Sequence, residues 1–132
     1  MTTPTDPNPA RPRVLVVDDV RIVAEAVARM LRQGHYDVET VASADEAIVA
    51  FDADPSGFDL LLSDVQLGGM TGFDLARELR ARRPGLPIVF MSAYVDDDEA
   101  EPPFGAPLVP KPFTRSTIIL TVARALDEAG DG

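Results

Sequence analysis

The sequence contains no cysteine, so disulfide bonds and metal sites built on thiolates are both excluded. It also lacks long apolar runs. None approaches the roughly 20 residues that a membrane-spanning helix needs, and the N-terminus has no apolar core of the kind found in signal peptides. These absences predict a cytoplasmic protein that does not associate with a membrane.

Positive charge is scarce as well. Twelve Lys and Arg residues stand against 22 Asp and Glu residues, which gives a formal net charge of −10. Such a surface repels phosphate backbones and anionic lipid headgroups, so we expect no direct binding to nucleic acid or to membranes. Lys111 is the only lysine among the basic residues.

The composition is that of a globular protein, with 45% hydrophobic and 26% charged residues in a chain of 132. This length is typical of a single domain. Residues 1–12 hold four of the twelve prolines and almost no apolar side chains, which predicts a disordered tail. We therefore place the domain at residues 13–129.

Two kinds of apolar pattern alternate along the domain. Short apolar or alternating runs predict strands at 14–17, 36–41, 60–62, 87–91 and 108–109. Helical periodicity and helix-capping residues predict helices at 20–32, 43–53, 73–82 and 114–128. This order is typical of an α/β fold with a doubly wound parallel sheet.

Polar residues that could take part in binding or catalysis follow the predicted strands. They are Asp18, Asp19, Asp64, Ser92 and Lys111. In doubly wound folds the carboxyl ends of the strands form one rim, where ligands bind. Carboxylates about 5 Å apart repel each other by roughly 3 kcal/mol, so three of them need a cation. Oxygen ligands of this kind favour Mg²⁺, and the serine and lysine suit a phosphate group bridged to the metal.

Four segments at these strand ends form a recognisable set: VLVVDD at 14–19, LLLSDVQLGGMTG at 60–72, MSAY at 91–94 and PKPF at 110–113. Together they resemble the receiver domain of two-component response regulators, a family to which chemotaxis regulators also belong. The GGM and MSAY wording is similar to receivers of hybrid sensor kinases. The resemblance covers about residues 13–129 and implies a five-stranded parallel sheet in the flavodoxin-like order 2-1-3-4-5.

The resemblance also implies a role for each matching residue. Asp64 would be the phosphoacceptor, while Ser92 and Lys111 would bind the phosphoryl group. Asp18, Asp19, Asp64 and the backbone carbonyl of Gln66 would hold Mg²⁺.

Two further residues of the matched segments acquire structural roles from the resemblance. Pro112 would follow a cis peptide bond that orients the lysine. Gly72 would allow the turn into the third helix.

Some positions depart from the family pattern. Leu108 occupies a place where the family usually has an aromatic residue that moves on activation, and Tyr94 is a candidate to replace it. Gln66 and Tyr94 flank the acceptor and are candidates for tuning the lifetime of the phosphoryl group. The stretch from Ser92 to Lys111 is short and contains four prolines, so we expect its helix to be short or degenerate.

The predicted function is a signalling switch that accepts a phosphoryl group from a sensor histidine kinase or a phosphotransfer protein. It would signal to a downstream protein by direct contact and would catalyse only its own phosphorylation and dephosphorylation. Two alternatives remain open, namely a binding module that is not phosphorylated and a phosphate sink in a relay. A dehalogenase-type phosphatase is disfavoured, because it needs a second acid at the position of Gln66.

Overall fold

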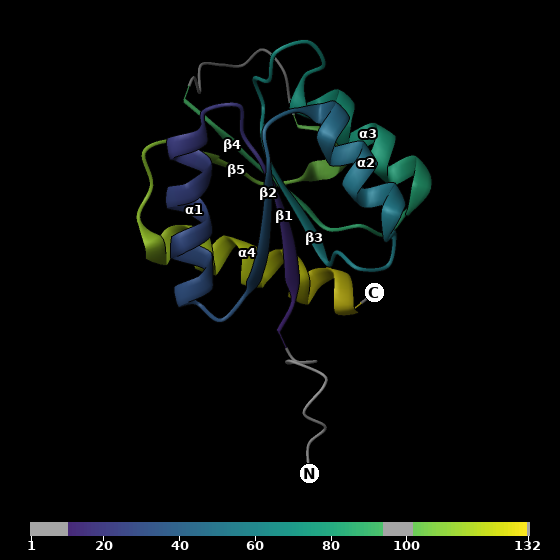
Figure 1. The fold of residues 1–132 in the computed structure, drawn as a ribbon. Coiled ribbons are helices and arrows are strands. Elements are labelled where there is room, and N and C mark those ends of the chain that lie inside the picture. Colours follow the sequence, from purple (N-terminus) through teal and green to yellow (C-terminus); the bar gives the residue numbers. More distant parts are fainter. Residues whose placement is uncertain (1–10, 94–101, 132) are drawn as a thin grey trace.

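The structure, a computed structural model, describes residues 11–93 and 102–131, with side chains described as far as residue 128. Strands and helices alternate along the chain (Figure 1). In order they are β1 (Arg13–Val17), α1 (Arg21–Gln33), β2 (Asp37–Val41), α2 (Ala44–Ala53), β3 (Leu60–Asp64), α3 (Gly72–Arg82), β4 (Ile88–Ser92), the 3-10 helix η1 (Pro103–Gly105), β5 (Leu108–Pro110) and α4 (Arg115–Asp131).

The five strands form one parallel sheet in the order β2-β1-β3-β4-β5. Helices α1 and α4 cover one face of the sheet, and α2 and α3 cover the other (Figure 1). The predicted doubly wound fold and its strand order are therefore confirmed. The strand predicted at 36–41 is β2, which lies at one edge of the sheet.

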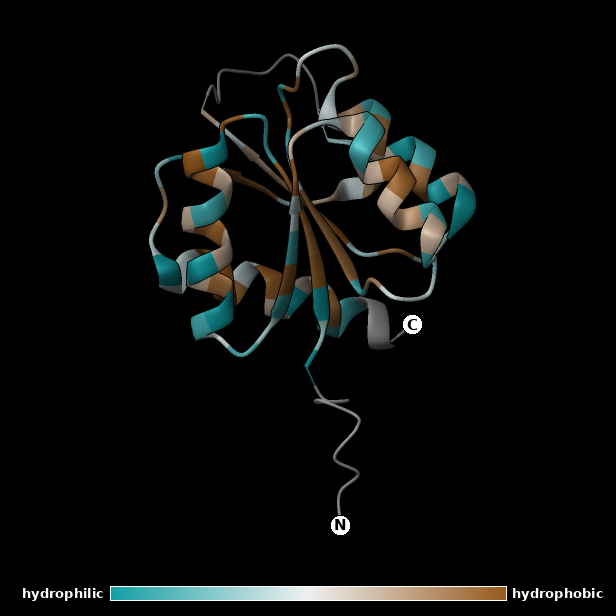
Figure 2. Cartoon of the chain, viewed as in Figure 1, coloured by the Kyte–Doolittle hydropathy of each residue, from teal (hydrophilic) through white to brown (hydrophobic). Residues whose placement is uncertain are grey.

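The core follows from the alternation of side chains along the central strands. Val14 and Val16 of β1 face the α1–α4 layer, whereas Leu15 and Val17 face the α2–α3 layer. All five residues of β3 and of β4 are buried, as expected for strands covered on both faces. Figure 2 shows these central strands as hydrophobic along most of their length.

Capping side chains set the start of two helices. The Ser43 hydroxyl accepts a hydrogen bond from the Glu46 amide at 3.1 Å, and Thr71 caps α3 in the same way. The Glu46 carboxylate forms a shifted variant of the capping box, because it accepts from the amide of Ala42 rather than that of Ser43.

Helix α1 begins differently. Its N-cap is Val20, which has no capping side chain, so the helix starts one residue later than predicted. The amide of Val20 instead donates to Oδ1 of Asp18 at 2.9 Å. A carboxylate of the candidate site therefore accepts from the amide of the N-cap residue, just before the first turn of α1.

Between β4 and β5 the described residues contain only the single turn η1, in agreement with the expected short or degenerate helix. Phe104 of η1 has a left-handed backbone (φ 64°) and an exposed ring, over which the Arg80 guanidinium lies at 4.5 Å. Residues 94–101, with Tyr94 and the acidic run that begins at Asp96, lie outside the described residues. Among the helices that the structure describes, none is long and apolar enough to cross a membrane.

Candidate functional site

The predicted site residues meet at the carboxyl end of the sheet, the upper end in Figure 1. Asp18 and Asp19 follow β1, and Lys111 follows β5. Asp64 and Ser92 are the last residues of β3 and β4, so these two strands run further than the apolar runs predicted. Because β1, β3, β4 and β5 are neighbours in the sheet, one rim collects all five residues.

Lys111 connects two of the carboxylates. Its Nζ lies 2.9 Å from Oδ2 of Asp18 and 2.8 Å from Oδ2 of Asp64. The lysine backbone is held in place because its amide donates to the carbonyl of Ser92 at 2.8 Å. The peptide bond between Lys111 and Pro112 is cis. Its side chain is only 17% exposed.

Three carboxylates gather at this rim. One oxygen from each of Asp18, Asp19 and Asp64 lies within 4.8 Å of the others. Asp18 and Asp64 are 1% and 6% exposed, whereas Asp19 is exposed. At 4.8 Å and an effective dielectric constant near 20, each pair repels by about 3.5 kcal/mol. The cluster therefore carries more negative charge than one lysine balances, and its hard oxygen ligands suit Mg²⁺.

Burial dominates the protonation of the central carboxylate. It raises the pKa of Asp64, and the hydrogen bonds from Lys111 and from the Gln66 amide only partly reverse this. Burial alone would lower the pKa of Lys111, but its bonds to Asp64 and Asp18 outweigh that effect, so the pKa lies above its usual value. Lys111 is therefore firmly cationic, while burial makes the charged form of Asp64 less favourable than it would be in water.

The turn after β3 fixes the backbone around Asp64. The Gln66 amide donates to Oδ1 of Asp64 at 3.0 Å. Gly72, the first residue of α3, packs directly on this turn. A Cβ atom there would lie 3.0 Å from the Asp64 carbonyl carbon and 3.0 Å from Ser63 Oγ, and closer still to the Asp64 carbonyl oxygen. The glycine is thus required for close approach, in addition to the turn that the sequence predicted.

The remaining predicted residues surround this centre. Ser92 is buried, Leu108 of β5 is half-buried, and the side chain of Gln66 is exposed. Tyr94 lies outside the described residues. Sequence reasoning missed Ser63, whose hydroxyl donates to the carbonyl of Asp64 at 2.9 Å. The available signal was a polar residue at the end of an otherwise apolar buried run.

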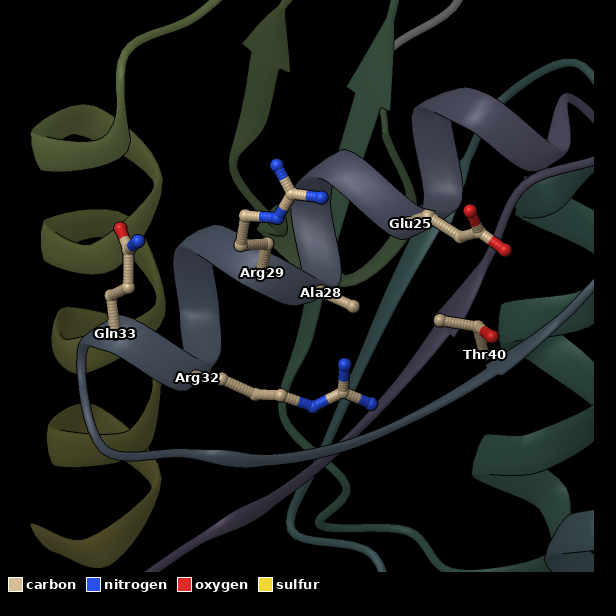
Figure 3. A pocket seen from close by; sticks show the side chains of 6 residues that line it. All are labelled: Glu25, Ala28, Arg29, Arg32, Gln33 and Thr40. Carbon is tan, nitrogen blue, oxygen red and sulfur yellow. The ribbon is translucent and has the colours of Figure 1, made fainter.

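Two grooves border α1. An apolar groove of about 410 Å³ reaches the site, because Lys111 lines it together with apolar residues that include Ile22, Met30 and Phe113. The other, of about 550 Å³, lies between α1 and Thr40 of β2 (Figure 3). Its lining is mostly polar and contains none of the site residues, so we assign it no part in the chemistry of the rim.

Comparison with known proteins gives a consistent result. The family model described as "Response regulator receiver domain" matches residues 14–123. Sensory transduction protein RegX3 of Mycobacterium tuberculosis is 31% identical over 123 residues, which cover 89% of this chain and 52% of the relative. The chain thus spans about half the length of this relative.

Solved structures agree with the sequence comparisons. The receiver domain of the hybrid histidine kinase CckA is 31% identical, with a TM-score of 0.75, over 86% of this chain and 98% of that one. The response regulator TrrA of Thermotoga maritima, solved in complex with Mg²⁺-BeF, is 25% identical with a TM-score of 0.78. That match covers 86% of this chain and 98% of the TrrA chain.

Proposed function

Because the chain belongs to the response regulator receiver domain family, we propose that it is a phosphorylation-dependent switch with Asp64 as its phosphoacceptor. The observation that carries this proposal is the contact between the Asp64 carboxylate and Lys111 Nζ, 2.8 Å long, beside two further carboxylates. A nucleophile, a cation for an incoming anion and ligands for a divalent metal lie within one small volume.

In the proposed reaction, a carboxylate oxygen of Asp64 attacks the phosphorus of a phosphohistidine on the donor. An O–P bond forms and gives an acyl phosphate. The P–N bond breaks, and its electron pair returns to the imidazole, which takes a proton from water. Phosphorylation adds about −1.5 to −2 charges. Lys111 exchanges its contact with Asp64 Oδ2 for one with a phosphoryl oxygen.

The donor set fits a magnesium ion. Carboxylate oxygens of Asp18, Asp19 and Asp64, with the backbone carbonyl of Gln66, would hold it, and the remaining positions suit water and phosphoryl oxygens. When bound, Mg²⁺ supplies positive charge that stabilises the phosphoryl group during transfer. The Mg²⁺-BeF complex described for TrrA supports this assignment by analogy.

We assign Ser92 to binding the phosphoryl group, because it ends the strand next to that of Asp64 and its amino acid type can donate to a phosphate oxygen. Gln66, Tyr94 and Leu108 remain our candidates for setting the phosphoryl lifetime and for the switch. Their roles follow from their places in the family pattern.

The phosphodonor would be a sensor histidine kinase or a phosphotransfer protein. Its docking site, in our proposal, is the apolar groove along α1. Ile22 is 77% exposed there, and the groove extends to Lys111, so a helix placed in it lies beside the phosphoacceptor. Output by protein contact, a cytoplasmic location and the absence of other enzymatic activity remain predictions from the sequence.

Intact-mass measurement tests the proposal directly. The chain is incubated with Mg²⁺ and a small phosphodonor such as acetyl phosphate, beside an Asp64→Asn variant and a sample containing a chelator. We expect one added phosphoryl group on the wild type only, and only with Mg²⁺. Failure to detect an adduct with small donors or with kinases would refute the proposed function and favour the binding module that is not phosphorylated. An adduct that forms and is hydrolysed without any effect on a downstream protein would favour the phosphate sink.

A further inference from the structure

Ser63 is a buried hydroxyl in a largely apolar part of the sheet. It follows Leu60, Leu61 and Leu62 in β3 and has no exposed surface. A hydroxyl in such a place is retained only where it forms a hydrogen bond, because burial without one is costly. Its partner therefore indicates what the residue does.

That partner is the backbone of the phosphoacceptor. Ser63 Oγ donates to the carbonyl oxygen of Asp64 at 2.9 Å. The same peptide group has its N–H on Val65, which donates to the carbonyl of Met91 at 2.9 Å. Because a peptide group is planar, these two bonds hold the plane that follows Asp64 at both ends.

The next peptide group is held in the same way. Its carbonyl, on Val65, accepts from the amide of Gly72 at 2.8 Å. Its N–H, on Gln66, donates to Oδ1 of Asp64 at 3.0 Å. Two successive planes are thus fixed at four points, and the Ser63 hydroxyl is the one side-chain donor among them.

We propose that Ser63 is a positioning residue for phosphoryl transfer to Asp64. By holding the first plane, its hydroxyl fixes the direction in which the Asp64 carboxylate leaves the backbone, toward Lys111 and the other carboxylates. It also fixes the start of the second plane, which leads to Gln66, the residue whose carbonyl is assigned to the metal. This inference rests on the proposed function of Asp64.

The test compares Ser63→Ala, which removes the donor, with Ser63→Thr, which retains it. Ser43→Ala is the matched control, because it also removes one serine hydrogen bond, at the start of α2. For each variant we measure the phosphorylation rate with acetyl phosphate at saturating Mg²⁺, the Mg²⁺ dissociation constant by titration calorimetry, and the urea midpoint. All rates are taken where the protein is folded.

We expect Ser63→Ala to phosphorylate about tenfold more slowly, as for other small misplacements of a reacting group, and to bind Mg²⁺ more weakly. Ser63→Thr should recover most of the rate, and Ser43→Ala should lose stability without losing rate. If the threonine variant does not fold, Ser63→Cys replaces it, with an intermediate rate expected from its weaker donor.

Wild-type rate and Mg²⁺ affinity in Ser63→Ala, with only a lower urea midpoint, would overturn the proposal and leave Ser63 as a packing residue. A wild type that accepts no phosphoryl group would instead refute the proposed function. Mg²⁺ binding then still decides whether Ser63 positions the Asp64 carboxylate.

Discussion

Replacing Lys111 with methionine should strongly destabilise the protein in buffer without Mg²⁺. The variant keeps a side chain of similar length but removes the cation that contacts Asp18 at 2.9 Å and Asp64 at 2.8 Å. Both carboxylates then remain buried without a positive partner. We expect the free energy of unfolding at pH 7 to fall by about 3–5 kcal/mol, the usual cost of breaking a buried ion pair from one side.

The distances support this magnitude. At an effective dielectric constant near 20, each contact of 2.8–2.9 Å contributes about 6 kcal/mol of Coulomb attraction. The mutual repulsion of the carboxylates is unchanged by the substitution. The expected loss of stability is smaller than the attraction removed, because methionine avoids the desolvation of the ammonium group and water can reach the unpaired oxygens.

Urea unfolding followed by far-UV circular dichroism measures the effect. Arg21→Met is the control, because its pair with Glu25 is exposed (87% and 61%), and such pairs contribute about 0.2–1 kcal/mol. Lowering the pH from 7 should narrow the gap between Lys111→Met and wild type. The pKa of Asp64 is already raised by burial, and without the lysine the folded state takes up protons that the unfolded chain does not. Added Mg²⁺ should narrow the gap as well.

A loss below about 1 kcal/mol at pH 7, the range of an exposed pair, would refute the reasoning. So would a larger loss that neither acidification nor Mg²⁺ reduces, because it would come from packing rather than from charge.

Four further predictions concern other parts of the fold. Gly72→Ala should lower the free energy of unfolding by about 1–3 kcal/mol, because the new Cβ meets the Asp64 backbone. Gly85→Ala should cause no such loss, because the space around Gly85 is open. Equal urea midpoints for the two variants would contradict this prediction. Tyr36→Phe should lose less stability than wild type above pH 10. Burial raises the pKa of Tyr36 above 10.0, so its contribution is present below pH 10 and is lost as the pH rises through the folded-state pKa, which urea titrations from pH 8 to 11 measure. Phe104→Gly should be more stable than Phe104→Ala by about 1 kcal/mol in thermal unfolding, because the φ of 64° is strained for any residue with a Cβ; the opposite order would show that the left-handed backbone is not maintained. Ile22→Ser should slow phosphorylation by a protein donor but not by acetyl phosphate, and equal slowing of both would exclude the docking role.

The fold was predictable because its signals are local. Val14 to Val17 and Leu60 to Leu62 are uninterrupted apolar runs. A short run of this kind is typical of a strand that is covered on both faces, because every side chain in it is then buried. The strand order came from the family resemblance. The ends of β3 and β4 were harder to predict, because Ser63, Asp64 and Ser92 are polar yet buried at the carboxyl edge, where ligand chemistry and sheet pairing overlap.

The meeting of Asp18, Asp64 and Lys111 was also predictable, since the carboxyl ends of neighbouring parallel strands share one rim. The hydrogen bond from Ser63 Oγ was not. A hydroxyl donor has several possible acceptors, and the choice depends on the approach of α3 at Gly72, which no local pattern encodes. The groove beside Ile22 likewise arises only when α1 packs next to residues that follow β5.

The missing cap of α1 gives the protein a built-in probe of its own site. The amide of Val20 donates to Oδ1 of Asp18, while Oδ2 of the same carboxylate contacts Lys111. The carboxylate of Asp18 therefore connects the start of α1 with the lysine and the other carboxylates of the site. Any change in the charge or contacts of these two oxygens should alter the strength of the bond from Val20. It should therefore alter how fast the Val20 amide hydrogen exchanges with solvent deuterium. Exchange at this single position would then report the state of the site without a label.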